Sequence, residues 1–228
     1  MFKKNKLDQL AFPLMLSNVL GLVIGLCDQA IMGHLSMECF AAVAIVSGFI
    51  NSVTGILGMT ATRFNILGSK ETTSVKVMDD MWAQVVLSVG IGLLSILGMV
   101  GCGPFIFQHI YQLKGAVLSD SLNYAMIFSS SIGLNLLLFT CSSYLKIVNQ
   151  TMYVLIGNTV AAMTNVLLDL VFVYGCSLGM IGNAIGSVLA LILNLIIYGY
   201  LFQRKGLLTV RKVKWERIGV ILWGSIPM

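Results

Sequence analysis

Two acidic residues lie inside long apolar runs of the chain. Asp28 falls late in the run Leu10–Met32, and Asp169 falls late in the run Met152–Gly175. At the centre of a membrane helix an acid costs about 2.5–3.5 kcal/mol, so it usually faces a water-filled cavity or a partner group. A carboxyl in such a place can hold a proton in one conformation and lose it, or exchange it for Na⁺, in another. The two acids therefore predict a site for H⁺ or Na⁺. The alternatives are a hydrogen bond between helices, or a position near enough to the membrane surface to stay hydrated.

Neutral polar residues recur at helical spacing in the same runs. Asn165 lies four residues before Asp169, so the two share one helix face. Asn165 and Ser187 offer neutral oxygen atoms, which suit a hard cation. Five further asparagines fall on polar faces of the apolar runs and are candidates to line a cavity: Asn18, Asn51, Asn135, Asn158 and Asn183. Close helix packing also uses small polar residues, but it does not require asparagine on several helices, so the pattern favours a polar cavity.

These residues must be positioned by six apolar runs, each with about the 20 residues that a membrane-spanning helix needs. The runs are Leu10–Met32, Cys39–Thr62, Met81–Cys102, Tyr124–Leu145, Met152–Gly175 and Gly179–Phe202, and a seventh starts near Ile218 and is cut off at Met228. The composition agrees, since 57% of the residues are hydrophobic and 10% are charged, whereas a soluble domain has about 25% charged residues. A soluble globular protein and a disordered one are therefore excluded. The expected fold is an all-α membrane protein, a bundle of six transmembrane helices followed by the start of a seventh.

The basic residues lie almost entirely on one side of these runs. Thirteen of the 14 Lys and Arg precede the first run or fall in the second, fourth and sixth connections, and only Lys114 falls on the other side. Positively charged loops stay in the cytoplasm, so we expect a cytoplasmic N-terminus in a plasma (inner) membrane of bacterial type. The net charge of +5 does not indicate nucleic acid as a partner, because a nucleic-acid surface would not be distributed over every second loop.

No catalytic constellation competes with a transport role. The five cysteines are scattered, no CxxC or His/Cys cluster occurs, and the two histidines lie near the ends of runs. We therefore expect neither an enzyme nor a cofactor, and no metal site beyond Na⁺ at Asp28 and Asp169. Pro13 lies in the first turns of the first run, where it either permits a kink or sits at a tolerated helix start.

Five short motifs follow one another along nearly the whole chain. They are P-x14-D-x4-G-H-L-S-x4-A-A from Pro13, G-S-K-E from Gly68, Y-L-K-x3-Q-T from Tyr144, N-x3-D from Asn165 and G-x2-G-x4-S from Gly179. In order and spacing they resemble the N-terminal part of the multidrug and toxin extrusion (MATE) family. Lys146 stands where that family usually has Arg. Ser187 stands where Thr is usual, which keeps the hydroxyl, and Asn183 replaces a small apolar residue.

The resemblance implies a transporter of twelve helices in two six-helix lobes. Such transporters export drug-like, often cationic compounds and are driven by inward flow of Na⁺ or H⁺. In one branch of the family the N-terminal lobe binds the coupling cation, and the matching positions here are Asp28, Asn165, Asp169 and Ser187. The proline of the family's first helix, proposed as a bending point, matches Pro13. The function implied is cation-coupled antiport, with no cofactor other than the coupling ion.

The resemblance also implies a division of the chain into three parts, because members of the family are roughly twice its length. Residues 1–202 would form the N-terminal lobe, residues 203–217 a basic cytoplasmic linker, and residues 218–228 the truncated start of a second lobe. The segment from Trp215 to Pro227 resembles the opening segment from Lys6 to Pro13, because both have charged residues, then an apolar run, then a proline. Such internal repeats are common in transporters.

The expected partners are the lipid bilayer, small amphipathic cations and the missing C-terminal lobe. A lipid-linked sugar flippase of the same superfamily is one alternative, but its anionic pyrophosphate cargo would call for Arg or Lys within the spans, and Arg63 lies only at a cytoplasmic end. A non-functional truncated fragment is a second alternative. A half-transporter that dimerises is a third, and the start of a seventh run weakens it.

Overall fold

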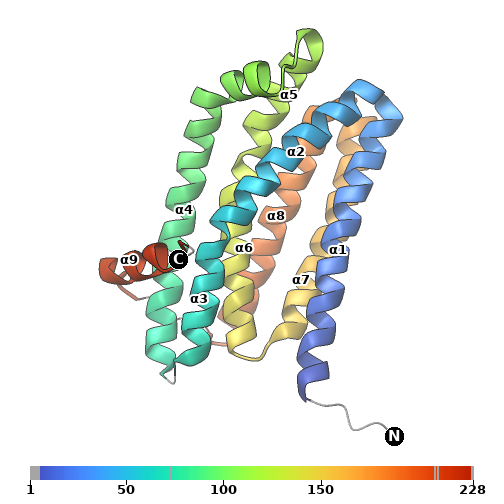
Figure 1. Cartoon of the computed structure of the whole chain (residues 1–228). Coiled ribbons are helices and arrows are strands. Elements are labelled where there is room, and N and C mark those ends of the chain that lie inside the picture. Colours follow the sequence, from blue (N-terminus) through green and yellow to red (C-terminus); the bar gives the residue numbers. More distant parts are fainter. Residues whose placement is uncertain (1–5, 72, 208, 210, 227–228) are drawn as a thin grey trace, which may run out of the picture.

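The chain is built almost entirely of helices. The computed structural model describes residues 6–71, 73–207, 209 and 211–226 (Figure 1). The α-helices are α1 (Lys6–Leu35), α2 (Met37–Leu57), α3 (Met59–Lys70), α4 (Ser74–Phe105), α5 (Gly115–Phe128), α6 (Ser130–Ile147), α7 (Thr151–Asp169), α8 (Gly179–Arg204) and α9 (Trp215–Trp223). Two π-helical turns, η1 (Ile106–Ile110) and η2 (Leu170–Gly175), extend α4 and α7.

Six stretches of the described chain are long and apolar enough to span a membrane, which confirms the predicted six-span bundle. Their bounds are Phe12–Leu35, Met37–Lys70, Ser74–Ile110, Gly115–Ile147, Thr151–Gly175 and Gly179–Arg204. Large apolar side chains such as Met15, Leu94 and Ile196 are exposed on the outside of the bundle. Since lipid solvates such a surface and water does not, this is a multi-pass membrane protein.

The connections between the spans alternate between the two ends of the bundle. The start of α1, the α3–α4 turn, the α6–α7 loop and the end of α8 lie at one end (Figure 1). The α1–α2, α4–α5 and α7–α8 connections lie at the opposite end (Figure 1). The first end therefore carries the basic segments identified in the sequence, and we call it the basic end.

The second span bends at Gly58, which the apolar run did not reveal. The backbone N–H of Gly58 still donates to the Thr54 carbonyl at 2.8 Å, so hydrogen bonding continues through the bend. A Cβ atom at Gly58 would lie 3.2 Å from the ring of Phe139 on α6. Glycine at this position therefore allows α6 to pack closely against the bend between α2 and α3.

The fourth span is divided at Ser129, between α5 and α6. The Ser129 hydroxyl donates to the Met126 carbonyl at 2.9 Å, and the Ser130 hydroxyl donates to the Ile127 carbonyl at 2.8 Å. Serine hydroxyls that bond back to the preceding turn bend helices, because they compete with the backbone for its acceptors. Beyond this bend, α5 packs against α2 and α8.

The predicted seventh run forms the short helix α9, which lies across the bundle beside α4 (Figure 1). It begins at Trp215, three residues before the expected start, and its nine residues are too few to span a membrane. The closing proline and methionine of the run lie outside the described residues.

Candidate ion and substrate site

Asp169 is the last residue of α7, immediately before the π-helical turn η2, and its side chain is fully buried. Its Oδ2 accepts a hydrogen bond of 3.0 Å from the Nδ2 of Asn183 on α8. The Oδ1 atom packs over Gly186 of α8, where a Cβ would collide with it. The close approach of α7 and α8 therefore encloses one oxygen of this carboxylate and hydrogen-bonds the other.

Asp28, on α1, lies near Asp169, close enough for the two carboxyl groups to influence each other. On the other side of Asp169, the Asn165 Nδ2 donates to the Ser187 Oγ at 3.1 Å and so ties α7 to α8. The structure thus brings the four residues of the predicted cation site, Asp28, Asn165, Asp169 and Ser187, into one region between α1, α7 and α8.

This region holds an unusual number of acceptor atoms without donors. Four buried oxygens accept no hydrogen bond from any described residue: Asp28 Oδ1, Asn165 Oδ1, Asp169 Oδ1 and Asn183 Oδ1. A buried polar atom without a partner costs about 1–3 kcal/mol, so these oxygens call for water, protons or a cation as partners. Their oxygen chemistry fits Na⁺ as well as H⁺.

A cavity of about 240 Å³ opens beside this region. Its walls come from α1, α2, α5, α6, α7 and α8, and its polar lining residues are Asp28, Asn51, Asn135, Asn165 and Ser187. Asn51 and Asn135 were predicted to line a cavity, and both lie in this wall. Asn183, also predicted as a lining residue, instead lies fully buried behind the wall, because it bonds to Asp169.

A second cavity, of about 460 Å³, continues from the first toward the basic end. Asn18, Asn135 and Asn158 line it, and Gly21, Ile24, Asn135, Ala161 and Leu191 belong to both cavities. The two cavities therefore form one groove along α1, α6, α7 and α8, which we call the central groove. Asp28 is the one ionisable residue among those lining it, and most of its wall is apolar.

A neutral polar cluster closes one side of the second cavity. Asn158 of α7 donates to the Ser17 hydroxyl of α1, and its Oδ1 accepts from the Asn194 Nδ2 at 3.0 Å and from the Tyr198 hydroxyl at 3.1 Å, both on α8. Asn158 therefore joins three helices. Sequence reasoning missed Ser17 and Tyr198, although Tyr198 lies one helical turn after Asn194 and this spacing is a usable signal.

Tyr124 of α5 is a second residue that sequence reasoning missed. Its side chain is 1% exposed and lies close enough to Asp28 and Asp169 for their charges to act on it. No pattern marked it, because a tyrosine at the end of an apolar run is ordinary at a membrane surface. It comes near the acids because α5 packs against α8.

Pro13 lies inside α1, about two turns after Lys6. It is therefore not at a helix start, and the tolerated-start interpretation is excluded. Because proline has no N–H, the carbonyl four residues earlier lacks its helical hydrogen bond. Pro13 stays the candidate bending point of α1.

No family model matches the chain, but it is similar to known transporters. The probable multidrug resistance protein NorM of Thermotoga maritima is 24% identical over 238 residues, which cover 98% of this chain and 50% of that protein. The multidrug export protein MepA of Staphylococcus aureus is 23% identical over 188 residues, which cover 79% of this chain and 41% of that protein. A solved structure of a multidrug resistance MATE family transporter of the MOP superfamily, in an outward-facing conformation, matches with a TM-score of 0.82 at 18% identity and covers 98% of this chain and 51% of that one.

The fold is that of one half of a MATE-type transporter. The resemblance to the MATE family found in the sequence motifs is thereby confirmed, by sequence similarity and by fold together. The chain spans about half the length of the curated relatives it matches, as one six-helix lobe of such a transporter would.

Proposed function

We propose that the chain is the N-terminal lobe of a multidrug exporter coupled to a cation, Na⁺ or H⁺. The observation that carries the proposal is the group of unpartnered oxygens around Asp28 and Asp169, since a cation or protons would satisfy them. Asn165 and Ser187 would contribute neutral oxygens to the same ion. The relatives that the chain resembles are themselves described as multidrug resistance and export proteins, which supports the transport part of the proposal.

The proposed mechanism is alternating access. An ion entering from outside binds Asp28 and Asp169 and neutralises their charge. The packing of α1 against α7 and α8 then changes, with Pro13 as the bending point, and substrate binding in the central groove weakens. Substrate leaves outward and the ion leaves inward.

Amphipathic organic cations are the proposed substrates. The central groove combines apolar walls, including Ile24, Phe128 and Leu191, with the single carboxyl of Asp28. A cargo with an anionic pyrophosphate headgroup is disfavoured, because no Lys or Arg is among the residues that line the groove. A lipid-linked sugar flippase therefore fits this lobe less well than a drug exporter does.

The test is drug efflux and cation flux by the native full-length protein in proteoliposomes, for Asp28→Asn and Asp169→Asn. Each substitution keeps the shape of the side chain and removes its charge, so drug efflux should fall to background and the coupled Na⁺ or H⁺ flux should disappear. Asp120→Asn is the matched control, since Asp120 is an exposed acid on α5 outside the central groove. Unchanged efflux and ion coupling in both site variants would overturn the proposal.

The length of the native polypeptide is a separate check. An immunoblot with an antibody to the N-terminal segment should detect a product near twice the size of this chain. A product that ends at Met228 would favour a truncated, inactive fragment or a half-transporter that must dimerise.

A further inference from the structure

Two acidic neighbours near the start of α4, Asp79 and Asp80, are buried inside the protein. Their side chains are 3% and 0% exposed, although the sequence places them at the edge of an apolar run. A buried carboxylate is strongly unfavourable unless charged partners compensate it. The partners of these two carboxylates come from residues 211–217, about 130 positions further along the chain.

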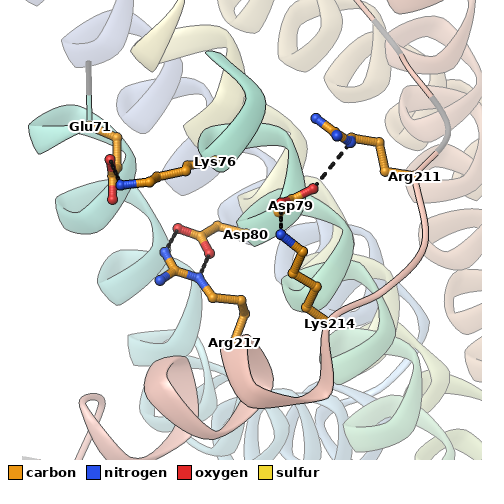
Figure 2. A network of polar contacts seen from close by, with 7 residues as sticks. All are labelled: Glu71, Lys76, Asp79, Asp80, Arg211, Lys214 and Arg217. Atoms are coloured by element: carbon orange, nitrogen blue, oxygen red, sulfur yellow. Dashed lines mark hydrogen bonds and ion pairs between the residues drawn. The ribbon is translucent and has the colours of Figure 1, made fainter. Parts of the chain in front are cut away.

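The two acids bind three basic residues of this distant segment (Figure 2). Asp79 Oδ1 pairs with the Arg211 Nε at 3.2 Å, and Asp79 Oδ2 pairs with the Lys214 Nζ at 2.8 Å. Asp80 receives Nε and Nη2 of Arg217 in a bidentate ion pair. Bidentate pairing fixes the orientation of both groups as well as their distance.

The two acids of α4 and the basic residues of the distant segment carry opposite charges that pair with one another. The hydrogen bonds that Arg217 makes to Asp80 raise the pKa of its guanidinium, so the pair stays ionised. Lys212, in the same segment, is exposed and forms no ion pair with any residue the structure describes. The pairing is therefore selective for three positions and does not result from basic composition alone.

Uncharged contacts also hold the chain to the bundle before and after residues 211–217. The Trp82 Nε1 donates to the Thr209 carbonyl at 2.9 Å, and the Tyr144 hydroxyl donates to the Leu207 carbonyl at 3.0 Å. On α9, Ile221 is fully buried. The described part of the segment thus contacts α6 at Leu207 and α4 at Thr209, Arg211, Lys214 and Arg217.

We propose that Asp79 and Asp80 form a docking site for residues 211–217, and that ion pairing at this site, more than apolar packing, holds α9 against α4. The segment acts as a strap that fixes the direction in which the chain leaves the six-span bundle. This inference does not depend on the proposed transport function, because it concerns only contacts at the basic end.

The test measures the rate at which a hydrophilic maleimide labels the thiol introduced by Ile221→Cys, in the full chain with its five native cysteines replaced by serine. With the strap docked the thiol is buried and labelling should be slow. Arg217→Gln together with Lys214→Gln should speed labelling by roughly a hundredfold, as expected when a buried ion pair loses one partner and local opening becomes easier. Lys212→Gln is the matched control and should leave the rate unchanged.

Two further variants separate ion pairing from misfolding. Asp80→Arg combined with Arg217→Asp restores opposite charges at the same place, so labelling should return to the slow rate. Asp80→Asn combined with Arg217→Gln leaves no uncompensated buried charge, so the chain should fold, elute as one species and still label fast. Slow labelling in that neutral pair, or fast labelling in the exchanged pair, would show that apolar packing of α9 holds the strap and would overturn the proposal.

Discussion

At the scale of single residues, the candidate site is defined by oxygen atoms that lack partners. Asp169 receives one hydrogen bond from Asn183, and Asp28 has a buried oxygen with none. Proteins seldom leave such atoms unsatisfied, since each costs about 1–3 kcal/mol. These oxygens are the reason to test the proposed cation site by charge neutralisation.

Gly186 gives a prediction at this scale. A Cβ there would collide with the Asp169 Oδ1, so Gly186→Ala must displace the carboxylate or separate α7 from α8. We expect a stability loss of about 1–3 kcal/mol, as overpacking usually causes, seen as a lower midpoint of thermal unfolding in detergent. Gly199→Ala on the same helix is the control, because no atom lies within 4 Å of a Cβ at that position. Equal midpoints for the two variants would contradict this description of the site.

At the scale of elements, α1 is joined to the rest of the lobe by polar contacts at two levels. At the upper level, one turn beyond Asp28, the Tyr174 hydroxyl donates to the Ile31 carbonyl of α1 at 3.0 Å. The lower level is the cluster around Asn158, which bonds to Ser17, Asn194 and Tyr198. A bend at Pro13 that moved the later part of α1 away from α7 would break the lower contact, because Ser17 lies one turn after the proline.

Asn158→Ala tests the role of the lower cluster. The substitution removes the partner of three side chains on two other helices, so α1 should open more often. We expect hydrogen exchange of backbone amides in residues 12–22 to speed up by about tenfold, the effect of losing roughly 1.4 kcal/mol of local stability. Thr159→Ala serves as the control, since that hydroxyl bonds only to the Leu155 carbonyl of its own helix. Exchange rates that do not differ between the two variants would mean that the cluster does not hold α1.

At the scale of the whole molecule, the basic segments gather at one end of the bundle (Figure 1). The positive-inside rule then predicts that this end faces the cytoplasm. The strap at Asp79 and Asp80 lies at the same end, so the exit of the chain from the lobe would also be cytoplasmic.

Thiol labelling of intact cells tests this orientation in a background without the native cysteines. Ala116→Cys, near the start of α5, lies at the end opposite to Ser69→Cys, near the end of α3, and both positions are exposed. A reagent that cannot cross the membrane should label the thiol of Ala116→Cys from outside, and that of Ser69→Cys only after the cells are opened. The reverse pattern would show that the lobe is inserted with the basic end outside.

The sequence by itself determined the membrane class, the six spans and the residues at which ion chemistry would be possible. It could do so because span length, apolar composition and an intramembrane acid are local properties that lipid imposes directly. The tertiary structure decided which of these polar residues meet. It moved Asn183 from a cavity wall to a buried partner of Asp169, brought Tyr124 near the acids through the packing of α5 against α8, and joined Asp80 to Arg217 across 137 positions. Such encounters depend on where separate helices approach one another, which a single run of residues does not encode.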